Sequence, residues 1–162
     1  MPDTCYYCGE SLFEGAAACQ HCGESLSQHT CSTILADQAL PKTDLAHLDV
    51  ATADLAAAYL GGFDFRGAMM NSVDLSDASL AGADFRGADL GYADFHQAQL
   101  NGADFRGANL LGADFSDADL CSADLSDANL RRVNLQGAQF NGATRWPEYF
   151  DPNAAGAVNI SG

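Results

Sequence analysis

A period of five residues governs most of this chain. Read from Thr43, the sequence divides into twenty consecutive blocks of five that end at Gly142, with no insertion or deletion. The third residue is apolar in all twenty blocks, twelve times Leu and six times Phe, and the first residue is Ala in fifteen. Internal repetition of this kind indicates an architecture in which each unit stacks on its neighbours.

A period of five fits neither an α-helix nor a flat strand. Five residues advance an α-helix by about 500°, which would spread the apolar positions around the axis. On a strand, an odd period would send successive apolar residues to opposite faces. The chain must therefore turn once in each block, and the recurrent Gly, Asn, Ser and Asp after the apolar residue suit such turns. The first and third positions of each block are then expected to point inward.

Three arginines indicate the number of sides in each coil. Arg66, Arg86 and Arg106 recur at a spacing of twenty, each preceded by Asp-Phe and followed by Gly-Ala. Twenty residues make four blocks, so the twenty blocks predict four sides per coil and about five coils. Low-complexity disorder is disfavoured because the apolar residues stay in register throughout.

Residues 43–142 resemble the pentapeptide-repeat family, whose motif is Ala-(Asp/Asn)-Leu-x-x. This resemblance implies an all-β fold, a right-handed quadrilateral β-helix, and we expect that solenoid to occupy residues 43–143.

The period breaks in residues 144–162, which we expect to form a C-terminal cap and tail. We expect four bulky residues to cover the last coil: Trp146, Pro147, Tyr149 and Phe150. The segment TRWPEYFDPNAAGAV is also similar to the C-terminal tail of many bacterial members of the family.

Two CxxC pairs near the N-terminus predict a metal site. The four cysteines are Cys5, Cys8, Cys19 and Cys22, and each pair is followed by Gly. Four thiolates suit one tetrahedral Zn²⁺ ion. Disulfides or a redox CxxC are alternatives, but no secretory signal is visible and the segment is too short for a βαβ unit. Residues 5–26 resemble short bacterial zinc-ribbon modules, which implies a structural metal, so we predict a ribbon at 1–27 holding one zinc ion.

Residues 28–42 read as a linker. Thr33 can cap a short helix that runs through Leu40 and stops at Pro41, and this helix would pack on the open N-terminal end of the solenoid. Cys31 is predicted to be an unpaired thiol rather than a further metal ligand.

The charge balance is strongly acidic, with 22 Asp and Glu against 7 Lys and Arg and a net charge of −15. Direct nucleic-acid binding is therefore disfavoured, because such a surface must neutralise phosphates. On a four-sided coil one face would gather six aspartates and no Lys or Arg: Asp54, Asp74, Asp77, Asp94, Asp114 and Asp117. These carboxylates either cap turns and keep the rod soluble, or form an anionic stripe that docks on a basic protein surface.

No catalytic constellation stands out in the repeats. His47 and His96 are expected on opposite faces with no Ser or Cys nucleophile paired with either, and Cys121 is isolated. Surface aspartates also lack a pocket that would shift their pKa values. The sequence therefore predicts a protein that is not an enzyme.

The function predicted is that of a protein-interaction scaffold with a structural zinc site, because solenoids work through extended contacts. The alternative is an acidic DNA mimic that binds a type II topoisomerase, since the repeats resemble those of gyrase-protecting pentapeptide proteins. The chain departs from that pattern in its few coils and its zinc ribbon. No apolar run of 18 residues and no signal peptide is visible, so we expect a bacterial cytoplasmic protein, with a homodimer left open.

Overall fold

The computed structural model describes residues 45–47 and 49–161. The zinc ribbon and linker predicted from the sequence lie outside the described residues, and so do Cys5, Cys8, Cys19 and Cys22. Within the described part of the chain, no helix is long and apolar enough to cross a bilayer.

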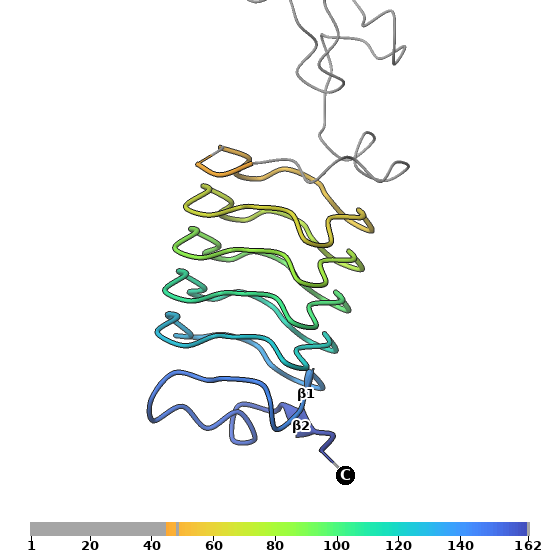
Figure 1. Ribbon diagram of the computed structural model, residues 1–162, viewed down its shortest axis with the longest axis vertical. Helices are drawn as coiled ribbons and strands as arrows, with labels where there is room; N and C mark the ends of the chain where they lie inside the picture. The colour runs from red at the N-terminus through yellow and green to blue at the C-terminus, as the bar shows by residue number, and fades with distance from the viewer. Residues whose placement is uncertain (1–44, 48, 162) are drawn as a thin grey trace, which may run out of the picture.

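The repeats wind into a stack of coils in which residues twenty apart lie side by side (Figure 1). One column of parallel bridges joins Asp54, Asp74, Asp94, Asp114 and Asn134 in turn. Three further columns follow the same spacing, so each coil has four sides, as the arginine spacing predicts. Most sides contribute a single bridge, and the strands in the described residues are β1 (Gln139–Phe140) and β2 (Val158–Asn159), which pair in parallel.

Each side repeats the same backbone hydrogen bonds. On one side, the Leu75 N–H donates to the Asp94 carbonyl (2.7 Å), and the Asp94 N–H donates to the Val73 carbonyl (2.9 Å). A turn follows in which the Ala78 N–H donates to the Leu75 carbonyl (3.2 Å). The last residue of each block up to Gly137 has a positive φ, and this left-handed residue redirects the chain into the next side. The backbone is thus paired between coils, and the outward side chains are left for other contacts.

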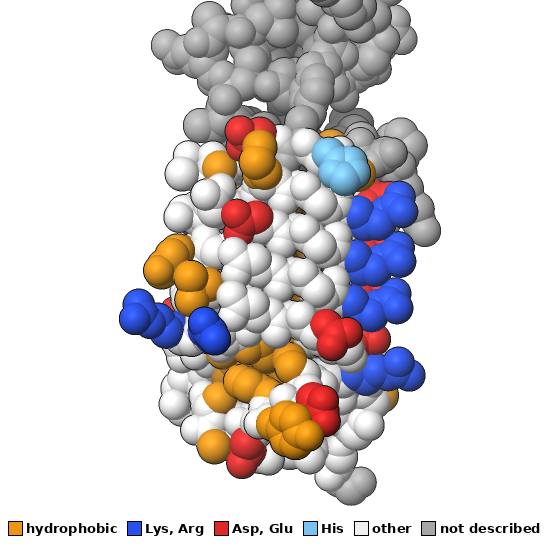
Figure 2. Space-filling model, turned by 90° about the vertical axis from the view of Figure 1, so that its left-hand side faces the viewer, with side chains coloured by type: hydrophobic (Ala, Val, Ile, Leu, Met, Phe, Trp, Pro, Cys, Tyr) orange, Lys and Arg blue, Asp and Glu red, His pale blue; other side chains and the backbone are white. Residues whose placement is uncertain are grey.

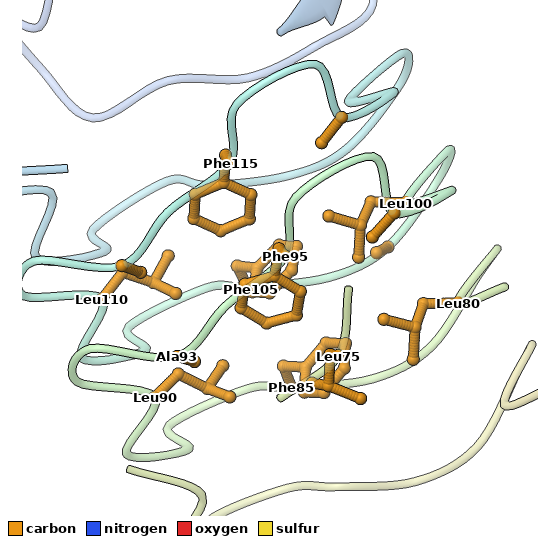
Figure 3. Packing of buried hydrophobic residues seen from close by; sticks show 14 of the residues in the cluster. Leu75, Leu80, Phe85, Leu90, Ala93, Phe95, Leu100, Phe105, Leu110 and Phe115 are labelled. Atoms are coloured by element: carbon orange, nitrogen blue, oxygen red, sulfur yellow. The ribbon is translucent and has the colours of Figure 1, made fainter. Parts of the chain in front are cut away.

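The interior of the coil is apolar throughout. Alternating Ala and Leu or Phe fill it, and no polar or charged residue is buried among the described residues. Phenylalanines stack along the axis, with ring centroids 4.9 Å apart for Phe85 and Phe105 and 4.7 Å apart for Phe95 and Phe115 (Figure 3). Each fully buried Leu or Phe contributes about 1.5–3 kcal/mol, so the stacked interior is the main stabilising element.

The tail continues the coil instead of only covering it. Arg145 pairs with Asp124 across 21 residues in place of twenty, so one extra residue enters the last coil. Trp146 then lies against Phe140 in an edge-to-face contact (5.5 Å) and stacks on Phe150 (5.5 Å). β2 adds to β1 at the end of the stack (Figure 1).

The expectation that Tyr149 covers the last coil is wrong. Its side chain is 95% exposed, whereas Trp146 and Phe150 are partly buried against the core. The reason is the turn at Pro147, where the Phe150 N–H donates to the Pro147 carbonyl (3.1 Å). Tyr149 has a positive φ of 65° in this turn.

Candidate interaction surfaces

The six aspartates singled out from the sequence occupy two kinds of position on one side of the coil. We call them the acidic face: Asp54, Asp74, Asp77, Asp94, Asp114 and Asp117. Four of them stand at the second position of their blocks and follow one another along a bridge column. Asp77 and Asp117 occupy the fifth position, with φ of 58° and 57°, and both are exposed.

The four stacked aspartates of the acidic face also have a local structural role. Each accepts, through Oδ1, a hydrogen bond from the backbone N–H two residues further on, as Asp94 does from His96 (2.9 Å). Asn134 makes the same bond to the Gln136 N–H (3.1 Å), so a neutral amide satisfies this position equally well. The turn therefore requires a side-chain oxygen at this position but does not require its negative charge.

Asp114 is the most heavily hydrogen-bonded member of the acidic face. It accepts from the Ser116 hydroxyl (2.6 Å), the Ser116 N–H (2.8 Å) and the Asn134 side-chain amide (3.0 Å). Partial burial on its own would raise the pKa of Asp114, but these hydrogen bonds outweigh it and hold the pKa below its ordinary value. Asp114 is therefore ionised at neutral pH.

His96 lies on the acidic face and does contact a serine, contrary to the sequence expectation. Its Nδ1 is 3.0 Å from Ser116 Oγ, one coil away. Because the Ser116 hydroxyl donates to Asp114, its proton is directed at the carboxylate and not at the imidazole. Among the described residues no carboxylate is hydrogen-bonded to the His96 ring to orient it, so the order of groups differs from that of a catalytic triad.

A second charged column runs along the corner that carries the repeated arginines, which are the blue groups at the right-hand edge of Figure 2. We call it the arginine ladder: Arg66, Arg86 and Arg106. Arg86 is bound to Asp84 of its own block, with Nη2 2.6 Å from Oδ2, and its Nε lies 3.6 Å from Asp104 of the next coil. The side-chain hydrogen bond from Arg66 likewise lowers the pKa of Asp64. Along this corner acidic and basic groups thus neutralise one another.

Arg145 adds a further arginine to this corner, two coils beyond Arg106, and the sequence reasoning missed it. Its Nη1 lies 3.6 Å from Asp124 Oδ2. The ladder arginines stand at the fourth position of their blocks, whereas Arg145 stands at a second position, opposite Asp124 and shifted by one extra residue, so counting from Arg106 in steps of twenty does not find it. The usable signal was the pair Arg145-Trp146, which reproduces the polar and apolar second and third positions of a block.

The remaining chemistry-bearing groups do not assemble into a reactive site. No group of three or more His, Cys, Asp or Glu residues within the described ranges could hold a metal ion. Burial and the neighbouring Asp119 raise the pKa of Cys121 to about 11, so its sulfur stays a thiol at neutral pH.

Comparisons with known proteins identify the fold. The family model for pentapeptide repeats matches eight copies, over residues 53–87, 70–107, 78–117 and 108–144. A search of curated proteins returned no match.

Three solved structures of pentapeptide-repeat or resistance proteins are similar to parts of this chain. A pentapeptide repeat protein from the cyanobacterium Cyanothece 51142 has 32% identity and a TM-score of 0.58, covering 58% of this chain and 64% of that one. One from the Arabidopsis thaliana thylakoid lumen has 41% identity and a TM-score of 0.42, covering 51% and 60%. QnrB1, a plasmid-mediated fluoroquinolone resistance protein, has 25% identity and a TM-score of 0.39, covering 59% and 62%.

The matched region therefore spans less than two thirds of the length of each of these three proteins. The family match, in contrast, extends over more than half of this chain, and the bridges every twenty residues repeat its motif in three dimensions. This chain belongs to the pentapeptide-repeat family.

Proposed function

We propose that this protein is a non-catalytic interaction scaffold whose acidic face docks on a basic surface of a protein partner. The solenoid holds the outward side chains at a fixed spacing, because every coil is hydrogen-bonded to the next. Proteins of the pentapeptide-repeat family are in general structural or interaction proteins without enzymatic activity. A stacked solenoid suits that role because it presents an extended surface at little conformational cost.

The observation that carries the proposal is the contrast between two columns built on the same block position. Asp64, Asp84 and Asp104 are each bound by an arginine of the ladder. On the acidic face, Asp54, Asp74 and Asp94 have no ion pair within the described residues, although they stand at equivalent positions. A face of unpaired carboxylates attracts and orients a cationic partner, and its effect falls with ionic strength.

The fold itself offers a conservative way to test this face. Asn134 shows that an amide keeps the turn hydrogen bond, so changing Asp74, Asp94 and Asp114 to Asn removes charge with little change in structure. A matched control changes Asp49, Asp89 and Asp119 to Asn, which occupy the same block position on other sides. Both variants lose three negative charges, but only the first loses them from the acidic face.

Affinity purification from the native cell, followed by mass spectrometry, is the first measurement. We expect a partner that is retained by the wild-type protein and the control variant, released by raised salt, and lost from the acidic-face variant. Equal recovery with both variants would contradict docking through this face, and so would binding that is insensitive to salt.

The alternative function, binding of a type II topoisomerase by DNA mimicry, rests on the one-sided distribution of carboxylates along a rod. It makes a narrower prediction, namely that micromolar protein changes the extent of DNA supercoiling by DNA gyrase. The effect should be lost with the acidic-face variant and kept with the control variant. No change in supercoiling at micromolar protein would remove this alternative and leave the scaffold proposal standing.

The proposal includes a structural zinc ribbon at Cys5, Cys8, Cys19 and Cys22, serving as a second docking point ahead of a right-handed quadrilateral solenoid of about five coils. Four thiolates fill a tetrahedral site and leave no open position for a substrate. Metal analysis should find about one zinc ion per chain, and Cys8→Ser should release it. Finding no zinc while all four thiols titrate freely would contradict the ribbon.

A further inference from the structure

The last coil is paired on only some of its sides. Beneath one side, the Leu125 N–H donates to the Arg145 carbonyl (2.8 Å), and the Arg145 N–H donates to the Ala123 carbonyl (2.9 Å). Beneath another side, β2 closes the edge of β1. Two sides lie between these in the path of the chain. On the side of residues 133–137 the Gly137 N–H donates to the Gly156 carbonyl (3.0 Å), whereas the side of residues 128–132 has no backbone partner beneath it among the described residues. We call residues 128–132 the open edge.

Three backbone groups of the open edge lack the partners that their counterparts have one coil earlier. There, the Leu110 N–H donates to the Asn129 carbonyl (3.1 Å), the Gly112 N–H donates to the Arg131 carbonyl (2.9 Å), and the Ala108 carbonyl accepts from the Asn129 N–H (2.9 Å). The equivalent groups of the open edge form no hydrogen bond with any described residue: the N–H groups of Leu130 and Arg132 and the carbonyl of Ala128.

A hollow of about 290 Å³ lies beneath the open edge. It is lined by Ala128, Asn129, Leu130, Arg131, Pro147, Glu148, Tyr149 and Phe150. In Figure 2 apolar side chains gather near the lower, C-terminal end of the side that faces the viewer. Ala128 and Leu130 are 7% and 8% exposed here, whereas Ala108 and Leu110 are 1% and 0% exposed. The end of the core is therefore accessible at this point, which gives an inserted apolar side chain somewhere to pack.

The charges beside the open edge favour an anionic occupant. Of the arginines that the structure describes, four are paired with aspartates, whereas Arg131 and Arg132 form no ion pair with another described residue. Glu148 also lines the hollow and Asp127 directly precedes the open edge, so these four groups balance to zero. The two unpaired arginines are nevertheless adjacent at one end of the open edge, so an acidic group bound at that end would have cationic neighbours. Beyond about 8 Å the acidic charge of the rest of the chain is screened at physiological ionic strength.

We propose that the open edge binds an extended acidic peptide of a partner protein as one additional rung of the coil. Strand addition of this kind takes its affinity from main-chain hydrogen bonds and its specificity from alternate side chains. The occupant is distinct from the basic partner proposed for the acidic face, because the unpaired side chains here have the opposite sign.

The hydrogen bonds of the coil above define the register of the peptide. One residue of the peptide would donate its N–H to the Ala128 carbonyl and accept from the Leu130 N–H, as Asn129 does with Ala108 and Leu110. The residue before it would face Ala128 and must be small, and the residue after it would enter the hollow and should be Leu or Phe. The next two would lie beneath Arg131 and Arg132. The motif predicted is therefore small, any, large apolar, acidic, acidic.

The test uses the full-length ¹⁵N-labelled protein and the synthetic peptide acetyl-Ser-Ala-Thr-Leu-Asp-Glu-Ser-amide. Titration should shift the amide resonances of Leu130 and Arg132 more than any others and slow their exchange with solvent. Changing Arg131 and Arg132 to Gln should weaken binding by about tenfold, as expected for two exposed charge pairs. The matched control changes Arg66 and Arg86 to Gln, which removes equal charge on the ladder and should leave the affinity unchanged.

Two altered peptides separate this proposal from simple charge attraction. N-methylation of the Thr removes the donor to the Ala128 carbonyl and should abolish the shifts, and replacing Asp-Glu with Lys-Lys should weaken binding. Shifts confined to the acidic face, equal binding of all three peptides, or no shift at millimolar peptide would overturn the proposal. It is also overturned if the Leu130 amide is already protected in the free protein, or if sedimentation shows a second copy of the chain occupying this edge.

Discussion

The regular coils (53–142) and the C-terminal end (143–161) use the same backbone bonds in different surroundings. In the middle of the regular coils each rung is hydrogen-bonded to a neighbour above and below, and inward residues such as Leu100 and Phe105 are fully buried. At the end, one side is closed by Arg145, another by β2, and the open edge by no described strand. A repeat alone can therefore specify the interior of a solenoid, whereas its termination requires residues that depart from the repeat.

The two regions also differ in how their aromatic residues pack. Phe105 is surrounded by Phe85, Phe95 and Phe115, with ring centroids between 4.9 and 5.8 Å away. At the end, Phe150 stacks on Trp146 only, at 5.5 Å, and is partly exposed. Equal truncations in the two regions should therefore have unequal costs.

The largest effect is expected from Phe105→Ala. This change removes a fully buried ring from the middle of the stack and should lower the free energy of unfolding by about 3–5 kcal/mol. The measurement is urea denaturation followed by circular dichroism. Phe150→Ala is the matched control at the C-terminal end and should cost less than half as much. Equal costs would mean that the end is as tightly packed as the regular coils.

A smaller effect is expected from Gly107→Ala. Gly107 has φ of 66° with open space around a Cβ, so Ala fits sterically but must adopt a left-handed backbone. We expect a loss of about 1–2 kcal/mol in the free energy of unfolding. Gly142 ends the final block without a positive φ, so Gly142→Ala should be neutral or slightly stabilising in the same urea experiment. Loss at Gly142 equal to that at Gly107 would contradict this difference in turn geometry.

Sequence reasoning succeeded where one physical constraint repeats and failed where it stops. The period of five predicts which side chains point inward, and the burial of the first and third positions confirms this. The spacing of Arg66, Arg86 and Arg106 predicts four sides, which the four bridge columns confirm. The contact of His96 with Ser116 was missed because it depends on which rotamers meet across adjacent coils. Arg145 was missed because the tail after Gly142 no longer keeps the spacing of twenty, and Tyr149 was misplaced because the turn at Pro147 leaves its side chain exposed.

Of the two candidate surfaces, one could be predicted from the sequence and the other could not. The acidic face can be listed from the sequence because its column is set by the period. The open edge cannot, because it is defined by hydrogen bonds that a following strand would have made. The sequence pattern of residues 128–132 matches that of the paired sides, so it does not indicate that the strand beneath them is absent.

Acid should destabilise the regular coils through their aspartates. The groups whose pKa is lowered all lie in the repeats, among them Asp104, where burial is outweighed by hydrogen bonds from Arg106, and Asp114. Because the folded pKa lies below the unfolded value near 3.8, these carboxylates stabilise the fold above that pH and cease to do so as the pH falls through the folded pKa. The melting temperature should therefore be flat from pH 7 to about 5 and fall below about 4.

The variant that changes both Asp104 and Asp114 to Asn provides the control for this acid transition. It should be slightly less stable at pH 7 and lose less stability between pH 5 and 3, measured as the melting temperature at each pH. An unchanged acid slope would mean that carboxylates other than Asp104 and Asp114 cause the transition.

The smallest effect is expected from Trp146→Phe at the C-terminal end. The Trp146 Nε1 is the one buried side-chain nitrogen or oxygen in the described residues that has no hydrogen-bond partner. Phe keeps the contacts with Phe140 and Phe150 and removes this unsatisfied donor, so lost apolar area and recovered desolvation should cancel to within about 1 kcal/mol. Trp146→Ala removes both ring contacts and should cost clearly more. If the two variants are equally destabilised in urea, the indole N–H has a partner in solution, and the end of the solenoid is then as fully specified as its coils.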